Sequence, residues 1–161
     1  MGSALRNLTG TTAAVAVTAV TGGLASAGVR SAWYETLDKP PFQPPAQVFP
    51  VAWTALYADI AVVSGVVLTA MERGGRSPEA RSFRTALAVN LVANAGWSWV
   101  FFRAHRLLPA AAVAGLLALS SADLARRSGG ASPYAAAALA PYPLWCGFAT
   151  ALSTAIWRRN R

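Results

Sequence analysis

The tryptophans are the residues of this sequence best suited to do chemistry. An indole ring is flat and largely apolar, stacks on other aromatic molecules, and carries an N–H group that needs a hydrogen-bond partner when it is buried. The chain has six tryptophans among its 161 residues. The four that lie well inside long apolar stretches are Trp53, Trp97, Trp99 and Trp145. A pocket for a flat ligand with polar edges would satisfy both the rings and their N–H groups.

Helical spacing places two asparagines beside one of these rings. Asn90, Asn94, Trp97 and Phe101 follow one another at intervals of four, three and four residues, which puts them on one helix face. An asparagine inside a membrane is costly unless it hydrogen-bonds another helix or a ligand. For Asn90 these two partners are about equally favoured, whereas for Asn94 a ligand is favoured.

Two further stretches each carry a tryptophan on a face with small or polar neighbours. In one stretch the face consists of Trp53, Tyr57, Ile60 and Ser64. In the other it consists of Pro141, Trp145, Ala149 and Leu152. Three helices would therefore each turn one tryptophan toward a shared interior.

Conventional catalytic chemistry is missing from the sequence. It contains no hydrolase elbow, no phosphate-binding glycine loop and no His/Cys/acid set with metal-ligand spacing, so we expect no metal site. Asp59 stands out, because a carboxylate in the middle of a membrane helix marks a functional site by default. It would be protonated or paired with an arginine at a neighbouring helix end. Cys146 is expected to be a small buried hydrophobe, and His105 an interfacial polar residue.

The elements that position these residues are apolar enough to cross a membrane. Hydrophobic residues make up 55% of the chain and charged residues only 12%, which is about half the charged share of a soluble domain. We therefore predict an all-α integral membrane protein, in which residues 1–161 form a single domain built as a bundle of five transmembrane helices. The helices are expected at about residues 9–29, 47–70, 83–102, 107–124 and 134–157.

The first apolar stretch has two interpretations. Arg6, a run of alanines and valines and the segment Ala25-Ser26-Ala27 are also typical of a secretory signal with its cleavage site. On these residues alone, the signal and a retained helix are almost equally favoured. Small residues at four-residue spacing, Ala19, Gly23 and Ala27, would let another helix approach closely and favour a retained helix. A small-residue helix face of this kind would also suit a homodimer.

The formal charge of +8 comes mostly from arginines in short clusters between the apolar stretches. Cations placed in this way flank membrane helices and meet anionic lipid headgroups. A nucleic-acid surface would need a basic face along one element, so we expect lipid contact and no binding of nucleic acid. The positive-inside rule gives no orientation, because seven lysines and arginines fall on each side.

Residues 30–46 are expected to form a long, stiff and ordered loop that closes one end of the bundle as a lid. A continuing helix is ruled out by four prolines, which are Pro40, Pro41, Pro44 and Pro45. The loop also carries Trp33, Tyr34 and Phe42, which a random polar linker would lack. Trp33, Tyr34 and Trp157 lie at predicted helix ends, where aromatic residues commonly form an interfacial belt.

Together these motifs resemble the TspO/peripheral benzodiazepine receptor family. The loop and the second helix contribute Trp33-Tyr34-x-x-Leu37-x-Lys39-Pro40-x-Phe42-x-Pro44-Pro45, Val48-Phe49 and Trp53-x-x-Leu56-Tyr57. The third and fifth helices contribute Asn94-x-x-Trp97-x-x-x-Phe101-Phe102, Pro141-Tyr142-x-x-Trp145-x-x-Phe148-Ala149-Thr150-x-Leu152 and Trp157-x-x-Asn160. Members of this family keep five spans and no cleaved signal, so the resemblance implies that the first helix is retained.

The resemblance further implies a bundle, often dimeric, that binds tetrapyrroles such as protoporphyrin IX and haem beneath the first loop, and in many members sterols and benzodiazepine-type drugs. Trp53 and Trp145 match two pocket tryptophans implicated in light-dependent porphyrin breakdown, which makes them candidates for a catalytic role. The expected ligand-binding residues are Trp33, Tyr34, Trp53, Tyr57, Asn94, Trp97, Trp145, Ala149 and Leu152. The expected lid residues are Lys39, Pro40, Phe42, Pro44 and Pro45.

Other features refine what the resemblance implies. The propionates of a porphyrin would meet Arg30 or Lys39 at the mouth of the pocket. Thr154 stands where the family's sterol-recognition stretch has a tyrosine, which argues against sterol binding. Phe42 replaces the loop's usual tryptophan, which keeps a stacking surface but removes a hydrogen-bond donor.

Three functions remain open. We favour a receptor or sensor that binds tetrapyrroles and regulates a porphyrin or stress response. The alternatives are a light- and oxygen-dependent enzyme that degrades porphyrin, and a carrier of porphyrin, sterol or another lipophile. None of them requires a cofactor, since porphyrin or haem would be the ligand. The alanine-rich, arginine-rich and lysine-poor composition suggests a bacterial plasma membrane, with the outer membrane as the alternative.

Overall fold

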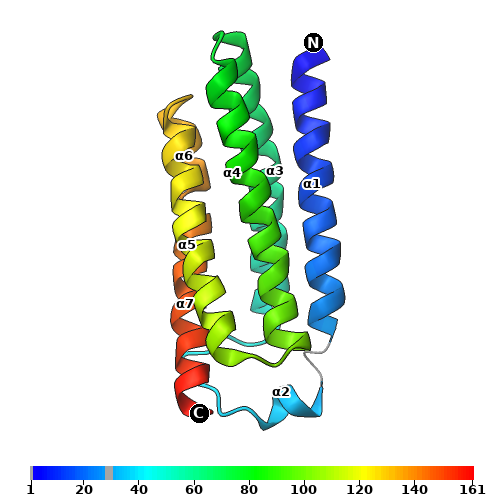
Figure 1. Ribbon diagram of the computed structural model, residues 1–161, viewed down its shortest axis with the longest axis vertical. Coiled ribbons are helices and arrows are strands. Elements are labelled where there is room, and N and C mark those ends of the chain that lie inside the picture. The colour runs from blue at the N-terminus through cyan, green and yellow to red at the C-terminus, as the bar shows by residue number, and fades with distance from the viewer. Residues whose placement is uncertain (1, 28–30) are drawn as a thin grey trace.

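The computed structural model describes residues 2–27 and 31–161, and every regular element within them is a helix. The long helices stand side by side in an elongated bundle, with the N-terminus at one end and the C-terminus at the other (Figure 1). They are α1 (Gly2–Ser26), α3 (Val48–Arg73), α4 (Ser77–Ser98), α5 (Leu107–Gly129), and the successive pair α6 (Pro133–Leu139) and α7 (Pro141–Arg159). The predicted all-α bundle is therefore confirmed.

The bundle presents an apolar surface to its surroundings. Five helical segments of the described chain are long and apolar enough to cross a membrane. Their outward faces carry aliphatic side chains that are more than half exposed, among them Val17, Val20, Val62, Val89, Val92, Leu116, Leu119 and Leu144. Apolar area of this extent suits contact with lipid. The prediction of an integral membrane protein is confirmed.

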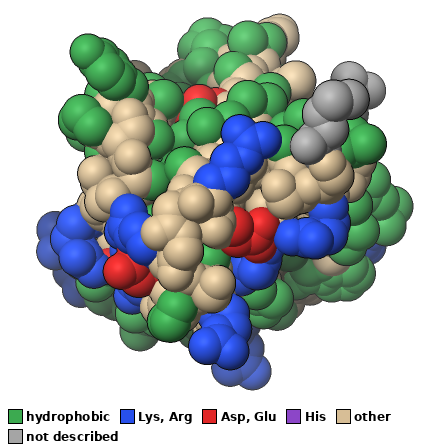
Figure 2. Space-filling model, turned by 90° about the horizontal axis from the view of Figure 1, so that it is seen from above, with side chains coloured by type: hydrophobic (Ala, Val, Ile, Leu, Met, Phe, Trp, Pro, Cys, Tyr) green, Lys and Arg blue, Asp and Glu red, His purple; other side chains and the backbone are tan. Residues whose placement is uncertain are grey.

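Charged side chains gather at the ends of the bundle. Figure 2 looks onto the end that holds the N-terminus and the α3–α4 turn, where arginines surround a few acidic side chains. Arg76 pairs with Glu79, and Arg126 pairs with Asp123 at 2.6 Å. This pattern matches a membrane protein whose helix ends lie at the level of the headgroups.

Two helices begin earlier than hydropathy indicates. α1 begins at Gly2 and not at about residue 9, because its first polar side chains find partners, as when Asn7 donates to Thr69 of α3 at 3.2 Å. α4 begins at Ser77 and not at about residue 83. Pro78 lies in its first turn, where the N–H that proline lacks has no intrahelical partner. α1 was expected to reach residue 29, and residues 28–30 lie outside the described residues.

The last predicted helix, 134–157, is divided in two. α6 ends at Leu139 and α7 begins at Pro141, because Pro141 and Pro143 have no N–H group with which to continue the helical hydrogen bonds. The break also changes which residue of this region faces the interior. Tyr142 is 1% exposed, whereas Pro141, predicted on the inner face, is exposed.

The end of α4 departs from regular helix as well. It continues into the π-helix η2 (Trp99–Arg103), and the N–H of Ala104 donates to the carbonyl of Trp99 at 2.9 Å. Such wide turns are rare and frequently occur at functional sites. Here the turn leaves Phe101 only 2% exposed.

The predicted lid is partly helical. It holds the short helix α2 (Ala32–Thr36), and the hydroxyl of Ser31 accepts a hydrogen bond from the N–H of Tyr34 at 3.3 Å. After α2 the chain runs without regular structure through the prolines and crosses beneath the bundle to reach α3 (Figure 1).

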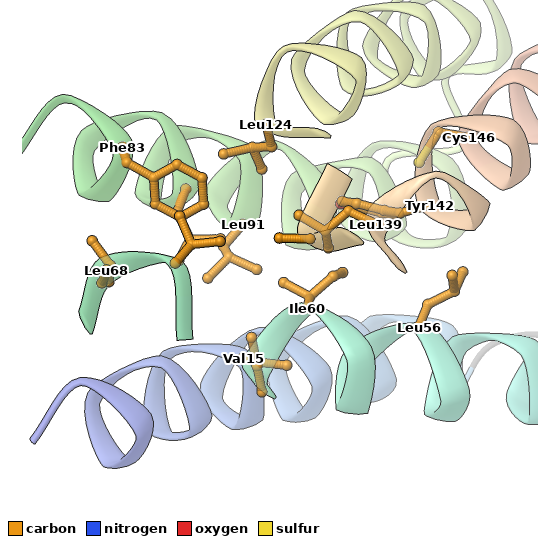
Figure 3. Packing of buried hydrophobic residues seen from close by; sticks show 14 of the residues in the cluster. Val15, Leu56, Ile60, Leu68, Phe83, Leu91, Leu124, Leu139, Tyr142 and Cys146 are labelled. Carbon is orange, nitrogen blue, oxygen red and sulfur yellow. The ribbon is translucent and has the colours of Figure 1, made fainter. Parts of the chain in front are cut away.

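A hydrophobic core joins the long helices (Figure 3). Its members come from every span, as shown by Val15 of α1, Ile60 of α3, Leu91 of α4, Leu124 of α5 and Leu139 of α6. Each of these side chains is at most 4% exposed. The free thiol of Cys146 is buried in the same core.

Small residues bring α1 close to its neighbours. A Cβ atom added to Gly65 of α3 would lie 3.0 Å from the Cα of Leu8. Gly22 of α1 similarly faces Ser98 of α4. Gly23, predicted to meet another helix, has no atom within 4 Å of such a Cβ position and lies on the outside. Pairing of two copies through that outer face therefore stays a prediction.

We expect Gly65→Ala to destabilise the bundle, because the new Cβ would meet the backbone of α1 and force the two helices apart. Overpacking of this kind costs about 1–3 kcal/mol. Gly23→Ala is the matched control, since it meets open space. Thermal unfolding in detergent, followed by circular dichroism, should show a lower midpoint for Gly65→Ala alone, and equal midpoints would contradict the close packing.

Candidate functional site

A chain of hydrogen bonds crosses the interior of the bundle. The Tyr57 hydroxyl donates to Asn94 Oδ1 at 2.8 Å, and Asn94 Nδ2 donates to the Tyr142 hydroxyl at 3.1 Å. The Tyr142 hydroxyl donates in turn to Asn90 Oδ1 at 2.7 Å, and Asn90 Nδ2 donates to Ser120 at 3.2 Å. The chain therefore connects α3, α4, α7 and α5.

These bonds account for the two asparagines in the membrane span. Asn90 is 0% exposed and Asn94 is 3% exposed, and both atoms of each side-chain amide are bonded to neighbouring helices. Of the two partners considered for Asn90, the structure shows another helix. Contact between Asn94 and a ligand stays a prediction.

The first aromatic group surrounds Trp53 and Trp145. Their ring centroids lie 6.5 Å apart with the planes at 89°, although the two residues come from different helices. Trp53 also lies 5.3 Å from Tyr57 and 6.4 Å from Tyr142. The remaining members are Phe49, 6.0 Å from Trp145, and Phe148, 5.5 Å from it.

The second aromatic group lies between α2 and the end of the helix bundle. Trp33 stacks on the ring of His105 at 3.9 Å and meets Phe101 edge-on at 5.8 Å. Tyr34 lies 5.7 Å from Phe102, and Trp97 stacks on Phe101 at 5.3 Å. The π-helix thus supplies the rings on which the first part of the lid rests.

The two groups share a border. Phe49 and Phe148 pack against the buried cluster that holds Phe101 and Leu152, as do Trp33, Tyr34 and Trp97, and they also meet Trp145. Ala149 is half-buried on α7, one turn after Trp145. The aromatic residues among the predicted ligand-binding residues therefore form one continuous group at the lid end of the bundle, which we call the aromatic lining. Its two halves hold Trp53 with Trp145, and Trp33 with Trp97.

The lid is fastened to the C-terminal end of α7. Asn160 Oδ1 accepts from the backbone N–H of Asp38 at 2.9 Å, and Asn160 Nδ2 donates to the Asp38 carbonyl at 2.9 Å. Arg159 pairs with the Asp38 carboxylate at 3.3 Å. Phe42 is half exposed and touches Phe148 edge-on at 6.4 Å, so the lid reaches the first aromatic group.

The other predicted lid residues differ in burial. Pro40 is buried, Pro44 is half-buried and Pro45 is exposed. The Lys39 ammonium lies 4.6 Å from the centre of the Tyr34 ring and donates to the Leu37 carbonyl at 3.3 Å, so its side chain packs against other residues of the lid. Arg30, the other cation expected at the mouth, lies outside the described residues.

Tyr34 is positioned to offer a hydrogen bond at the lid. Burial raises the pKa of its hydroxyl above the ordinary value, and a hydrogen bond from Gln43 Nε2 at 3.3 Å opposes this shift only in part. The hydroxyl therefore keeps its proton at neutral pH and can act as a donor.

Four buried polar atoms have no hydrogen-bond partner within residues 2–27 and 31–161: Gln43 Oε1 on the lid, Ser64 Oγ on α3, and two more. One of these two is the indole Nε1 of Trp97, which is a free donor inside the second aromatic group. The other is Oδ2 of Asp59, for which we expected protonation or an arginine partner.

Trp99 is 43% exposed and faces outward, and the guanidinium of Arg103 lies 5.9 Å from the centre of its ring.

Sequence reasoning missed several residues of this lining. Tyr142 links two asparagines and touches Trp53, yet the sequence motif that contains it did not predict a role for it. Its position three residues before Trp145 on a helix was the available signal. For Phe49 and Phe148 the motifs likewise predicted no role, and Ser120 gave no signal at all.

We expect Tyr142→Phe to lower the thermal stability, because it removes only the hydroxyl that joins Asn94 to Asn90 and leaves both amides short of a partner. The loss should be about 1–2 kcal/mol. Tyr134→Phe is the matched control, since Tyr134 is 85% exposed. Thermal unfolding of both variants in the same detergent measures the difference, and an unchanged midpoint for Tyr142→Phe would argue against a stabilising role for the hydrogen-bond chain.

Comparison with known proteins gives consistent matches. The profile of the TspO/MBR family matches residues 11–158. Protein CrtK of Rhodobacter capsulatus is 34% identical over 152 residues, which cover 91% of this chain and 88% of the relative. The translocator protein of Homo sapiens is 34% identical over 80% of this chain and 75% of its own. The tryptophan-rich sensory protein of Cereibacter sphaeroides is 32% identical over 80% of this chain and 77% of its own.

Proposed function

The chain belongs to the TspO/MBR family of membrane proteins, and on that basis we propose that it is a receptor that binds tetrapyrroles, such as protoporphyrin IX or haem, within its aromatic lining. In this role it senses the ligand and regulates a porphyrin or stress response. The observation that carries the proposal is the meeting of Trp53 and Trp145, from two helices, with Phe148 linking Trp145 to Phe42 of the lid.

The aromatic composition of the lining supports a flat ligand. A macrocycle stacks best against several indole and phenyl faces, and such contacts contribute about 0.5–1.5 kcal/mol per aromatic pair beyond the burial of area. In the structure these rings contact one another, so a macrocycle would have to enter between Trp53 and Trp145. Phe42 of the lid packs edge-on against Phe148, which contacts Trp145, so movement of the lid would uncover this side of the lining.

Polar groups at the lid end suit the edges of the same ligand. The indole N–H of Trp97 is buried with no partner in the described chain, and a ligand oxygen or nitrogen would satisfy it. Lys39 lies on the lid and carries the positive charge that a propionate needs. Ligand binding would release Lys39 from its contact with Tyr34.

The names of the relatives support the role more broadly. The relative from Cereibacter sphaeroides is called a sensory protein, and the human relative a translocator protein. The first name agrees with sensing and the second with a carrier. Sensing is favoured here because the lining is continuous with the hydrogen-bond chain through Tyr57 and Tyr142, which gives ligand binding a path to other helices.

One observation favours an enzymatic role as the second candidate. Two redox-active indoles meet 6.5 Å apart where the porphyrin would enter, and they could control a reaction between the excited porphyrin and oxygen. The protein would then convert porphyrin to a bilin-like product under light, and Trp53 and Trp145 would be the residues involved.

We expect purified protein in detergent to bind protoporphyrin IX saturably, with a shifted Soret band. Trp145→Ala should weaken the affinity about tenfold, because losing one stacked indole removes about 1.4 kcal/mol. Trp99→Ala is the matched control, since this tryptophan faces outward. Equal affinities for the two variants would contradict binding between Trp53 and Trp145.

Illumination of the same complex separates the two candidates. A receptor should return to its original spectrum in the dark without a new product. An enzyme should form a protein-dependent product that is lost in Trp53→Phe and in Trp145→Phe but kept in Trp99→Phe. Failure of the wild-type protein to bind porphyrin would leave a carrier of another lipophile.

A further inference from the structure

A second candidate site lies at the opposite end of the bundle from the lid. A groove of about 500 Å³ runs between α1 and α4, with α3 as its floor. We propose that it binds an anionic phospholipid, with one acyl chain along the groove and the phosphate at Arg6 and Arg84. The proposal is independent of the tetrapyrrole site, because none of the residues of the aromatic lining borders this groove.

The groove exists because α1 and α4 touch at one end and diverge toward the other. They are in close contact at Gly22, where an added Cβ would lie 3.4 Å from the Ser98 hydroxyl oxygen. Toward the N-terminal end, α4 leans away from α1 (Figure 1). There Arg84 spans the gap and donates to Asn7 Oδ1 at 3.0 Å.

The lining of the groove is apolar below its mouth. Small side chains on both helices leave the space open, and α3 and α4 supply aliphatic walls; these residues are Gly10, Ala14, Leu68, Leu87, Ala88 and Leu91. The volume is within the range of about 300–1,000 Å³ typical of small-molecule sites. Because α1 and α4 are both membrane-spanning helices, the groove opens sideways into the hydrocarbon layer, where an acyl chain is the molecule at hand.

The mouth of the groove carries an excess of positive charge. Arg6 pairs with Glu72 at 3.0 Å, and Arg84 pairs with the other oxygen of the same carboxylate. Two guanidinium groups therefore share one carboxylate, and each has N–H donors left over. Glu72 is also held by Asn7 Nδ2 at 2.9 Å, so the cluster is fixed in place.

Both arginines can reach an anion. Their side chains are 68% and 43% exposed, whereas that of Glu72 is 19% exposed, so the outer face of the cluster is cationic. Figure 2 shows this end of the molecule, where blue arginine side chains outnumber the red acidic ones. A guanidinium fork matches the geometry of a phosphate, which favours an anionic lipid over a zwitterionic lipid whose own ammonium would be repelled.

Native mass spectrometry of the detergent-solubilised full chain tests the proposal, with dioleoyl phosphatidylglycerol and dioleoyl phosphatidylcholine as the probes. We expect at least tenfold stronger retention of the first lipid. The double variant Arg6→Gln/Arg84→Gln should abolish this preference. The matched control is Arg73→Gln/Arg81→Gln, which removes the same charge from the same end but from residues that do not border the groove.

A second variant keeps the arginines and fills the groove. Ala88→Leu should also reduce retention of phosphatidylglycerol about tenfold, and circular dichroism shows whether each variant keeps its helices. Inorganic phosphate should not compete, since the acyl chain is part of the ligand. Equal losses in the control pair would overturn the proposal in favour of general surface charge. Unchanged retention in Ala88→Leu would overturn it too, and a simultaneous change in oligomeric state would then assign the groove to a second copy of the chain.

Discussion

Polar side chains inside a bilayer must find their hydrogen-bond partners within the protein, because the surrounding hydrocarbon offers none. Asn90 and Asn94 of this chain meet that requirement through Tyr57, Tyr142 and Ser120. Each of the partners lies on a different helix, so the requirement fixes the positions of α3, α5 and α7 around α4. Hydrophobic contacts alone would not specify this arrangement, since an aliphatic surface packs equally well against lipid and against another helix.

The same bonds determine where the aromatic rings lie. Tyr57 is held against Asn94, which turns Trp53, one helical turn earlier, toward the interior of the bundle. Tyr142 is held between the two asparagines, which does the same for Trp145. The π-helix then moves Phe101 and Phe102 beneath α2, where they support Trp33 and Tyr34. Polar bonds deep in the bundle thus position an apolar lining at its end.

The spans and their tryptophan faces could be predicted because hydropathy and helical periodicity depend on nearby residues only. The helix break at Ala140 was harder to predict, because Pro141 lies at helical spacing from Trp145 and was expected on the inner face. Only the fold shows that Tyr142 faces the interior instead. The hydrophobic periodicity of residues 83–102 did not predict the π-helix at the end of this span. The partners of Asn94 lie 37 and 48 residues away, so no local pattern could identify them. The early start of α1 depends in the same way on Thr69 and Glu72 of another helix.

A molecule that separated Trp53 from Trp145 would also disturb the hydrogen-bond chain. Tyr57 and Tyr142 lie 5.3 and 6.4 Å from the ring of Trp53, and both of their hydroxyls are bonded to Asn94. Insertion of a macrocycle would therefore shift at least one tyrosine and change its bond to α4. A ligand can shift a conformational equilibrium only through contacts that differ between two states. Because Tyr57 and Tyr142 belong both to the aromatic lining and to the hydrogen-bond chain, ligand binding would change contacts between helices. A sensor needs such a change, and a simple carrier does not.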